Sequence, residues 1–179
     1  MTKDKVAKIV QAQSGNPVLR GFAESVPLEE IKSEKIKRIL DLMKNSLAGE
    51  EEGVAIAAPQ IGIPLRIFLI SKKIFQLEKN PNIDNEEAED LIFINPELVK
   101  LSRGKEIMEE GCLSVIDYFG KVRRATKATV RAYDENGNVF ERGGSGLLAQ
   151  IFQHEMDHLN GILFTDTAKD VQKIVKDKK

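Results

Sequence analysis

The chain has 179 residues, of which 41% are apolar and 31% charged, so it is long enough for one domain with a buried core. Its net charge is −1 and its basic residues are scattered except at the tail, so no basic stripe indicates direct nucleic-acid binding. The sequence has no apolar run near the roughly 20 residues of a membrane span, and its charged start does not lead into a secretory signal. We therefore expect a cytoplasmic protein with no membrane contact, in which the single cysteine is free.

An irregular N-terminal arm precedes a helix in the first third of the chain. Apolar residues recur with the 3.6-residue period from about 28 to 48, and Gly49 is a candidate C-cap. The small and apolar residues of 53–62 fit two hypotheses: a buried strand and tight turn with Gln60 at its surface end, or a backbone that comes close to a ligand. A buried strand over 66–71 follows.

The rest of the chain predicts more strands, one long helix and a helical tail. The predicted elements are an acidic loop at 76–90, strands at 91–94 and 97–101, a hairpin of strands at 128–133 and 139–141, a helix at 145–161 and a tail helix at 168–179. Asn136 and Gly137 supply the positive φ of the hairpin turn. Ser145 is the candidate N-cap of the long helix, and Gly161 ends it.

The only two histidines of the sequence, His154 and His158, lie four residues apart with Glu155 between them. On a helix, positions i and i+4 share one face, so both imidazoles can bind one metal ion while Glu155 projects beside it. The alternative is a pair of solvated histidines on a polar helix, which the apolar flanks disfavour. A catalytic site of this type needs three protein ligands and one open position for water, so a third ligand is required.

The third ligand has several candidates. No glutamate follows Glu155, and the position that would supply a metzincin's third ligand is Phe164, which cannot bind a metal. Three aspartates after the histidines are formally available: Asp166, Asp170 and Asp177. The remaining candidate is Cys112, which as a thiolate would complete a two-His, one-Cys site. A lone cysteine is also common as a small buried apolar side chain.

Three blocks of sequence together resemble the peptide deformylases: 53–60, 110–114, and 153–158 with Gly161. Their order and spacing agree with that family, and the resemblance covers the chain to about residue 165. It implies an α+β fold in which small, mostly antiparallel sheets pack around the metal-binding HExxH helix. It also implies a single domain over 1–179, in which 166–179 is a C-terminal tail.

The resemblance implies removal of the formyl group from the N-terminal formyl-methionine of new polypeptides. The implied metal ligands are Cys112, His154 and His158. Glu155 would take a proton from water and deliver it to the departing amine. The Gln60 side-chain amide and the Leu113 backbone N–H would stabilise charge on the formyl oxygen.

Further residues receive roles from the same resemblance. Glu110 is the implied acid that orients a metal ligand, with Arg124 at the spacing of its ion-pair partner, although a surface pair is the alternative. The pocket for the methionine side chain is expected to lie against four residues: Val54, Met108, Leu147 and His154. Three positions depart from the family pattern and bear on substrate preference: Ala55 for a glycine, Phe119 for an arginine, and Gln150 for an apolar side chain.

The implied cofactor is one divalent ion, ferrous iron, and Zn²⁺, Ni²⁺ or Co²⁺ can take its place in purified protein because imidazole and thiolate bind them all. The expected partners are formyl-methionyl peptides, including ribosome-associated nascent chains. Three other functions stay open: a divergent amidase with a different substrate, a non-catalytic module stabilised by its metal, and a hydrolase with Cys112 as nucleophile and His154 as base.

Overall fold

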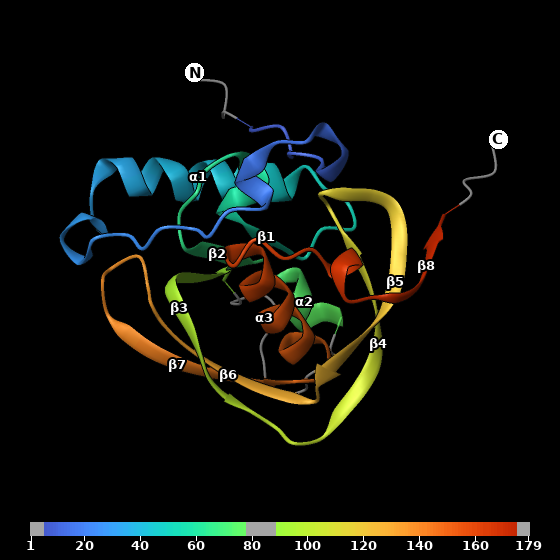
Figure 1. The fold of residues 1–179 in the computed structure, drawn as a ribbon. Helices are drawn as coiled ribbons and strands as arrows, with labels where there is room; N and C mark the ends of the chain where they lie inside the picture. The colour runs from blue at the N-terminus through green and yellow to red at the C-terminus, as the bar shows by residue number, and fades with distance from the viewer. Residues whose placement is uncertain (1–5, 78–88, 175–179) are drawn as a thin grey trace.

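The computed structural model describes residues 6–77 and 89–174. In it, two antiparallel sheets lie on either side of helix α3 (Gly146–Leu159), which carries both histidines (Figure 1). The larger sheet has the order β1 (Ala55–Ala57), β2 (Ile67–Ile70), β3 (Leu91–Leu101), β6 (Lys127–Tyr133) and β7 (Val139–Ser145). The smaller sheet has the order β4 (Lys105–Cys112), β5 (Val115–Ala125) and β8 (Lys169–Lys173). The predicted α+β class, with antiparallel sheets around the histidine helix, is confirmed.

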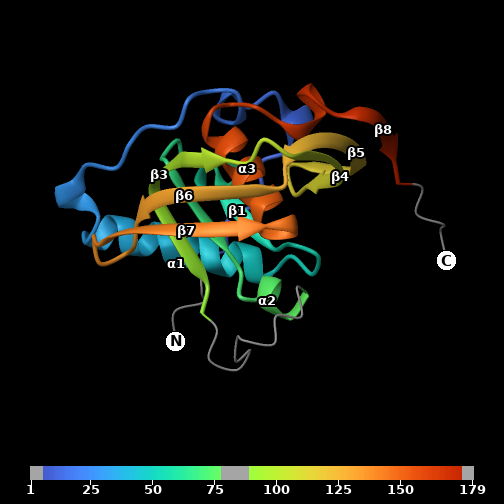
Figure 2. The ribbon, with the colours of Figure 1, turned by 90° about the horizontal axis from the view of Figure 1, so that it is seen from below.

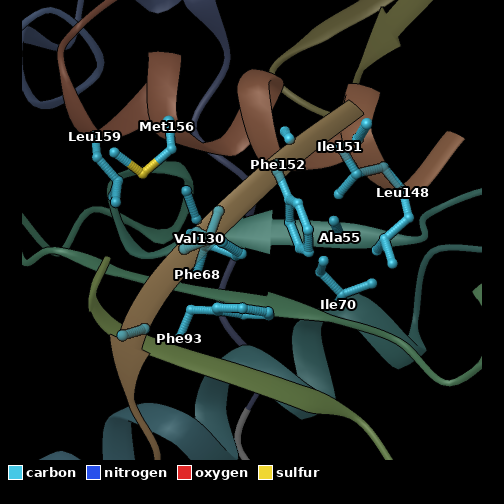
Figure 3. Close-up of a cluster of buried hydrophobic side chains, with 14 of the residues drawn as sticks. Ala55, Phe68, Ile70, Phe93, Val130, Leu148, Ile151, Phe152, Met156 and Leu159 are labelled. Carbon is cyan, nitrogen blue, oxygen red and sulfur yellow. The ribbon is translucent and has the colours of Figure 1, made fainter. Parts of the chain in front are cut away.

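The larger sheet is covered by a helix on each face: α1 (Glu34–Ala48) on one side and α3 (Gly146–Leu159) on the other (Figures 1 and 2). Side chains of a strand alternate between faces, so Ile67 packs on the α1 side and Phe68 on the α3 side. Phe68 stacks on Phe93 with ring centroids 4.4 Å apart, and Phe93 meets Phe152 of α3 edge to face (Figure 3). This core fixes α3 against the sheet.

The helix predicted over 28–48 is shorter than expected at its start. Leu28–Glu30 forms a 3-10 turn, and α1 begins only after Ser33, whose hydroxyl accepts a hydrogen bond from the Ile36 N–H at 3.3 Å. Such an N-cap satisfies a backbone donor that has no partner within the helix, which sets the start of the helix. Gly49 is the C-cap, as predicted.

The strands predicted at 91–94 and 97–101 are one strand, β3, with a bulge at the Asn95-Pro96 break. Asn95 has a φ of 51°, and its side chain bonds both the N–H and the carbonyl of Val26. The Asn95 side chain and the bond from the Asn95 N–H to the Arg66 carbonyl, at 2.8 Å, together hold the bulged backbone. The strands β4 and β5 were not predicted. The residues of β4 are mostly exposed, and β5 has Ile116 at an exposed position and Arg124 at a buried one, so apolar and polar residues do not alternate strictly along either strand.

The prediction of a helix at 168–179 is wrong for residues 168–174, which are the part that the structure describes. Residues Lys169–Lys173 form β8, which pairs with β5, and the Ile174 N–H donates to the Asp117 carbonyl at 2.7 Å. The open edge of β5 offers these bonds, and a short polar segment has no helical periodicity strong enough to compete.

Of the loop predicted at 76–90, residues 78–88 lie outside the described part of the chain. Residues 76 and 77 belong to α2 (Lys73–Leu77). Within 6–77 and 89–174, no helix is long and apolar enough to span a membrane.

Candidate metal centre and catalytic cleft

Helix α3 presents His154 and His158 one turn apart, with their ring centroids separated by 4.9 Å. The opposite face of the helix packs into the apolar core on the larger sheet. Gln153 fixes the rotation of the helix, because its amide accepts from the Ala125 N–H at 2.9 Å and donates to the Ala125 carbonyl at 3.0 Å. The histidine face is therefore directed at the smaller sheet.

Cys112 meets the histidines from the end of β4. Its Sγ lies 3.2 Å from His158 Nε2, and one donor atom from each of Cys112, His154 and His158 falls within 4.8 Å of the others. The Ser114 N–H donates to the same sulfur at 3.4 Å. The chain turns sharply here, since the β4–β5 register shifts between Gly111 and Cys112. The three predicted ligands are thus brought together by two distant segments.

The charge state of this cluster suits a divalent cation. Burial by itself would raise the pKa of the Cys112 thiol, but the charge of His158 and hydrogen bonds from His154 and His158 lower it to about 5. The sulfur is then a thiolate at neutral pH, and thiolate with two imidazoles is a ligand set for zinc or iron. His158 Nδ1 is buried and has no hydrogen-bond partner within the described residues. The donor set therefore fits a metal ion.

A buried ionic network contacts the Nδ1 side of the His154 ring. Glu110 accepts two hydrogen bonds from Arg124, at 2.6 and 2.9 Å, and its Oε2 lies 2.9 Å from His154 Nδ1. Arg124 also donates to Asp157 at 2.7 Å. Burial would raise the pKa of Glu110, but the bonds from Arg124 and His154 lower it to about 2. A carboxylate in this position fixes which imidazole nitrogen faces the cluster, as is typical of metal-bound histidines.

Gln60 lies on the other side of the cluster, in the 3-10 turn Ala58–Ile61 that follows β1. Its Oε1 accepts from the Ala57 N–H at 2.8 Å, which leaves Nε2 pointing at Ser114 Oγ, 3.3 Å away, and at the sulfur of Cys112, 3.6 Å away. Gln60 is only 1% exposed. Of the two hypotheses for 53–62, the strand and turn are present, but the expected surface position of Gln60 is wrong.

Glu155 is buried beside the cluster and reaches the cleft. Its Oε2 has no hydrogen-bond partner within the described part of the chain, and burial, the largest effect, raises the pKa of this carboxyl. A carboxyl group with a raised pKa and a free oxygen can both accept and return a proton. The cleft that it faces has a volume of about 660 Å³, within the range of sites that enclose small ligands.

Only some of the residues that we expected to contact the substrate line the cleft. Val54, Ala55, Leu147 and Gln150 line the cleft, together with Leu113. Met108 is half-buried on β4 and does not belong to the lining, and the side chain of Phe119 does not either. Gln150 Nε2 donates to the Glu109 carbonyl at 2.7 Å, so this amide links α3 to β4 across the cleft wall.

Two residues at the site were missed in the sequence. Asp157 is the second acidic partner of Arg124, and Ser114 accepts from Gln60. The position of Asp157, one turn after Gln153 on the histidine helix, was a usable signal. Ser114 lies in the 110–114 block, but that block gave no sign of its bond to Gln60, which is 54 residues away in the chain.

Comparisons with known proteins agree on one family. The chain matches the family model described as Polypeptide deformylase over residues 6–174. A peptide deformylase of Halothermothrix orenii is 43% identical over 153 residues, 85% of this chain and 88% of that protein. The crystal structure of the class I type b peptide deformylase from Acinetobacter baumannii, with Met-Ala-Ser bound, has a TM-score of 0.78 and 32% identity, covering 92% of this chain and 99% of that one. For peptide deformylase from Thermotoga maritima the TM-score is 0.75 and the identity 30%, with the same coverage.

Proposed function

The chain belongs to the polypeptide deformylase family, and on that premise we propose how its cleft residues perform the reaction. The protein is a hydrolase that removes the N-terminal formyl group from polypeptides. We propose formyl-methionyl peptides as its substrates and Cys112, His154 and His158 as the ligands of one divalent metal ion. The observation that carries this assignment is the cluster of three donor atoms within 4.8 Å beside an unpartnered buried carboxyl oxygen.

A divalent ion held by these three residues would supply Lewis acidity, which lowers the pKa of water from 15.7 towards 7. We propose Fe²⁺ as the physiological ion, with Zn²⁺, Ni²⁺ or Co²⁺ as ions that can replace it in purified protein. The contribution of the chain is to keep Cys112 ionised and to orient His154 through Glu110.

Glu155 is the proposed general base and acid. Its free Oε2 would accept a proton from the attacking water as the new carbon–oxygen bond forms. The same atom would return that proton to the amine nitrogen as the formyl carbon–nitrogen bond breaks. The raised pKa of this buried carboxyl suits both directions, because a base and acid of this kind works best when its pKa is close to the working pH.

The proposed donors to the formyl oxygen are Gln60 Nε2 and the Leu113 backbone N–H. The Gln60 amide is held by the Ala57 N–H on its oxygen side, which turns Nε2 towards the Cys112 sulfur and Ser114 Oγ. The formyl oxygen would take the place of one of these two acceptors. Fixed donors of this type stabilise negative charge that develops in the transition state, because they need no reorganisation during the reaction.

We also propose that the methionine side chain lies against Val54, Leu147 and Gln150, with Ala55 beside the substrate backbone. Ribosome-associated nascent chains as the source of substrate, and the cytoplasm as the compartment, are proposals that rest on the family's reaction. The scattered basic residues give no support for direct binding of nucleic acid.

The test is formate release from formyl-Met-Ala-Ser by protein purified without oxygen, with metal content measured in the same sample. We expect turnover that disappears when a chelator removes the ion and returns when Fe²⁺ is added. Chelation also separates this proposal from a cysteine-nucleophile hydrolase, which would keep its activity without metal. Protein with a full metal complement and no formate release would contradict the proposed function.

A further inference from the structure

The N-terminal arm runs between the two segments that carry the proposed donors to the formyl oxygen. The Val10 N–H donates to the carbonyl of Gln60, and the Ala12 N–H donates to the carbonyl of Ser114, both at 2.8 Å. Gln60 and Ser114 belong to different parts of the fold, the turn after β1 and the turn before β5. The arm therefore ties these two parts together beside the metal centre.

Gln11 lies between these two bonds and points its side chain at the same turn. Its Nε2 donates to the carbonyl of Leu113 at 2.9 Å, across 102 residues of sequence. Its Oε1 is buried and has no hydrogen-bond partner within the described residues. An apolar side chain of the same size would remove this unsatisfied oxygen but would leave the Leu113 carbonyl without its donor. The bond to the Leu113 carbonyl is therefore what Gln11 contributes at this position.

The bond from Gln11 restrains the backbone on one side of the Leu113 N–H. Leu113 follows Cys112, whose sulfur is anchored in the cluster by His158, and it precedes Ser114, whose carbonyl is held by Ala12. The Leu113 N–H lies in the peptide plane before the Leu113 Cα, and the Leu113 carbonyl lies in the plane after it. A hydrogen bond that fixes the second plane limits how far the first can rotate, because the two planes share that Cα. Without Gln11, the peptide unit that contains the Leu113 carbonyl keeps, among the described residues, only the 3.4 Å bond from the Ser114 N–H to the Cys112 sulfur.

We propose that Gln11 is a positioning residue that fixes the Leu113 N–H in the direction needed to stabilise charge on the formyl oxygen. This inference rests on the proposed function of Leu113. Gln11 does not line the cleft, so it would act through the Leu113 backbone without touching the substrate. An interaction of this kind is expressed mainly in the transition state, and its loss lowers kcat while KM stays nearly constant.

The test compares Gln11→Leu and Gln11→Met with the parent chain, all loaded with the same metal. Both variants keep most of the side-chain volume and remove the donor, so one of them suffices if the other folds poorly. Gln13→Leu is the matched control, because Gln13 is an exposed glutamine of the same arm. We expect kcat to fall by about 10-fold to 100-fold in the Gln11 variants, with KM within about 3-fold and metal content unchanged.

A second readout is independent of turnover. In zinc-loaded, ¹⁵N-labelled protein, the Leu113 and Ser114 amide signals should broaden in the Gln11 variants and stay sharp in Gln13→Leu. Full kcat in the Gln11 variants, or unchanged signals at Leu113, would overturn the inference. If the parent chain releases no formate, the proposed function has failed instead, and the amide signals alone then decide whether Gln11 orders the turn.

Discussion

The cleft has two halves that are built differently. The inner half consists of five buried or half-buried lining residues, Gln60, Glu110, Cys112, His154 and Glu155, and of Arg124, Asp157 and His158, which do not line the cleft but bond to these residues or to one another. The outer half consists of exposed or half-exposed lining residues: Glu50, Glu51, Glu52, Ile116, Tyr118, Leu147 and Gln150. Gln60 and His158 are each 1% exposed, whereas Ile116 is 51% exposed.

The two halves also differ in how their side chains are held. Inner residues are joined by hydrogen bonds that come from four separate segments, so a change at one of them leaves a buried partner unsatisfied. In the outer half, Gln150 has one bond to a backbone carbonyl, and water can replace what a substitution removes. We infer that the inner half determines the chemistry. Substitutions in the outer half can change substrate preference with little loss of folding stability.

The largest effect is expected at Glu155 in the inner half. Glu155→Gln keeps the shape of the side chain and removes its capacity to accept a proton, so kcat should fall by about 10²-fold to 10⁴-fold with metal content unchanged. Formate release and metal analysis on the same samples measure both quantities. Glu29→Gln, at an exposed position outside the cleft lining, is the control and should stay within about 2-fold of the parent. Full turnover by Glu155→Gln would contradict its role as the base.

Removal of Arg124 should affect stability strongly. Arg124→Met leaves Glu110 buried at 4% exposure without its cation, and a broken buried ion pair typically lowers the free energy of unfolding by about 3–5 kcal/mol. Arg131→Met is the control, because Arg131 pairs with Glu141 where both side chains are 50% exposed, and such pairs contribute only about 0.2–1 kcal/mol. Urea denaturation of both variants measures the difference. Equal losses would show that burial does not separate these two pairs.

A smaller effect is expected at Gln150 in the outer half. Gln150→Ile replaces an amide in the pocket wall by an apolar side chain, which should favour an apolar first residue of the substrate. We expect the preference for formyl-Met over formyl-Gln peptides, measured as a ratio of kcat/KM values, to rise by about 5-fold, at the low end of what such pocket changes give. Gln13→Ile, in the exposed part of the arm, should leave the ratio unchanged. An unchanged ratio in Gln150→Ile would remove Gln150 from the specificity pocket.

The sequence allowed prediction where the signal is local. The spacing of His154 and His158, the periodicity of α1 and the Asn-Gly turn of the β6–β7 hairpin all arise from neighbours within a few residues. The contacts that complete the site join residues that are far apart in the chain. Gln11 reaches Leu113 across 102 residues and Arg124 reaches Asp157 across 33, and nothing in residue spacing reports such pairs.

The elements that were missed lie mainly at the surface. Strand β8 is exposed along its whole length, so its side chains carry no alternation that would distinguish a strand from a helix. The pairing that makes it a strand is offered by β5, which was itself not predicted. The single-domain organisation over 1–179 stays a prediction.

The smallest effect is expected at the ion pair between Arg20 and Asp166, an exposed counterpart of the Arg124–Glu110 pair. The side chains of Arg20 and Asp166 are 52% and 36% exposed, compared with 9% and 2% for Arg124 and Glu110. Partial burial would raise the pKa of Asp166, but hydrogen bonds from Arg20 and the Leu163 N–H, with the charge of Arg20, lower it. Because the folded pKa lies below the unfolded value of about 3.9, the ionised carboxylate stabilises the fold above that pH.

This contribution should disappear as the pH falls through the lowered folded pKa of Asp166. Asp166→Asn retains an oxygen for the Leu163 N–H and loses the charge, so at pH 7 it should reduce the free energy of unfolding by no more than about 1 kcal/mol. Urea denaturation of metal-free protein at pH 7 and at successively lower pH should show the gap between parent and variant closing. Added salt at pH 7 should narrow the same gap, since exposed charges are screened. A gap that is independent of pH would mean that the hydrogen bond to Leu163, and not the charge, is what Asp166 contributes, and the contrast with the buried pair would then rest on Arg124 alone.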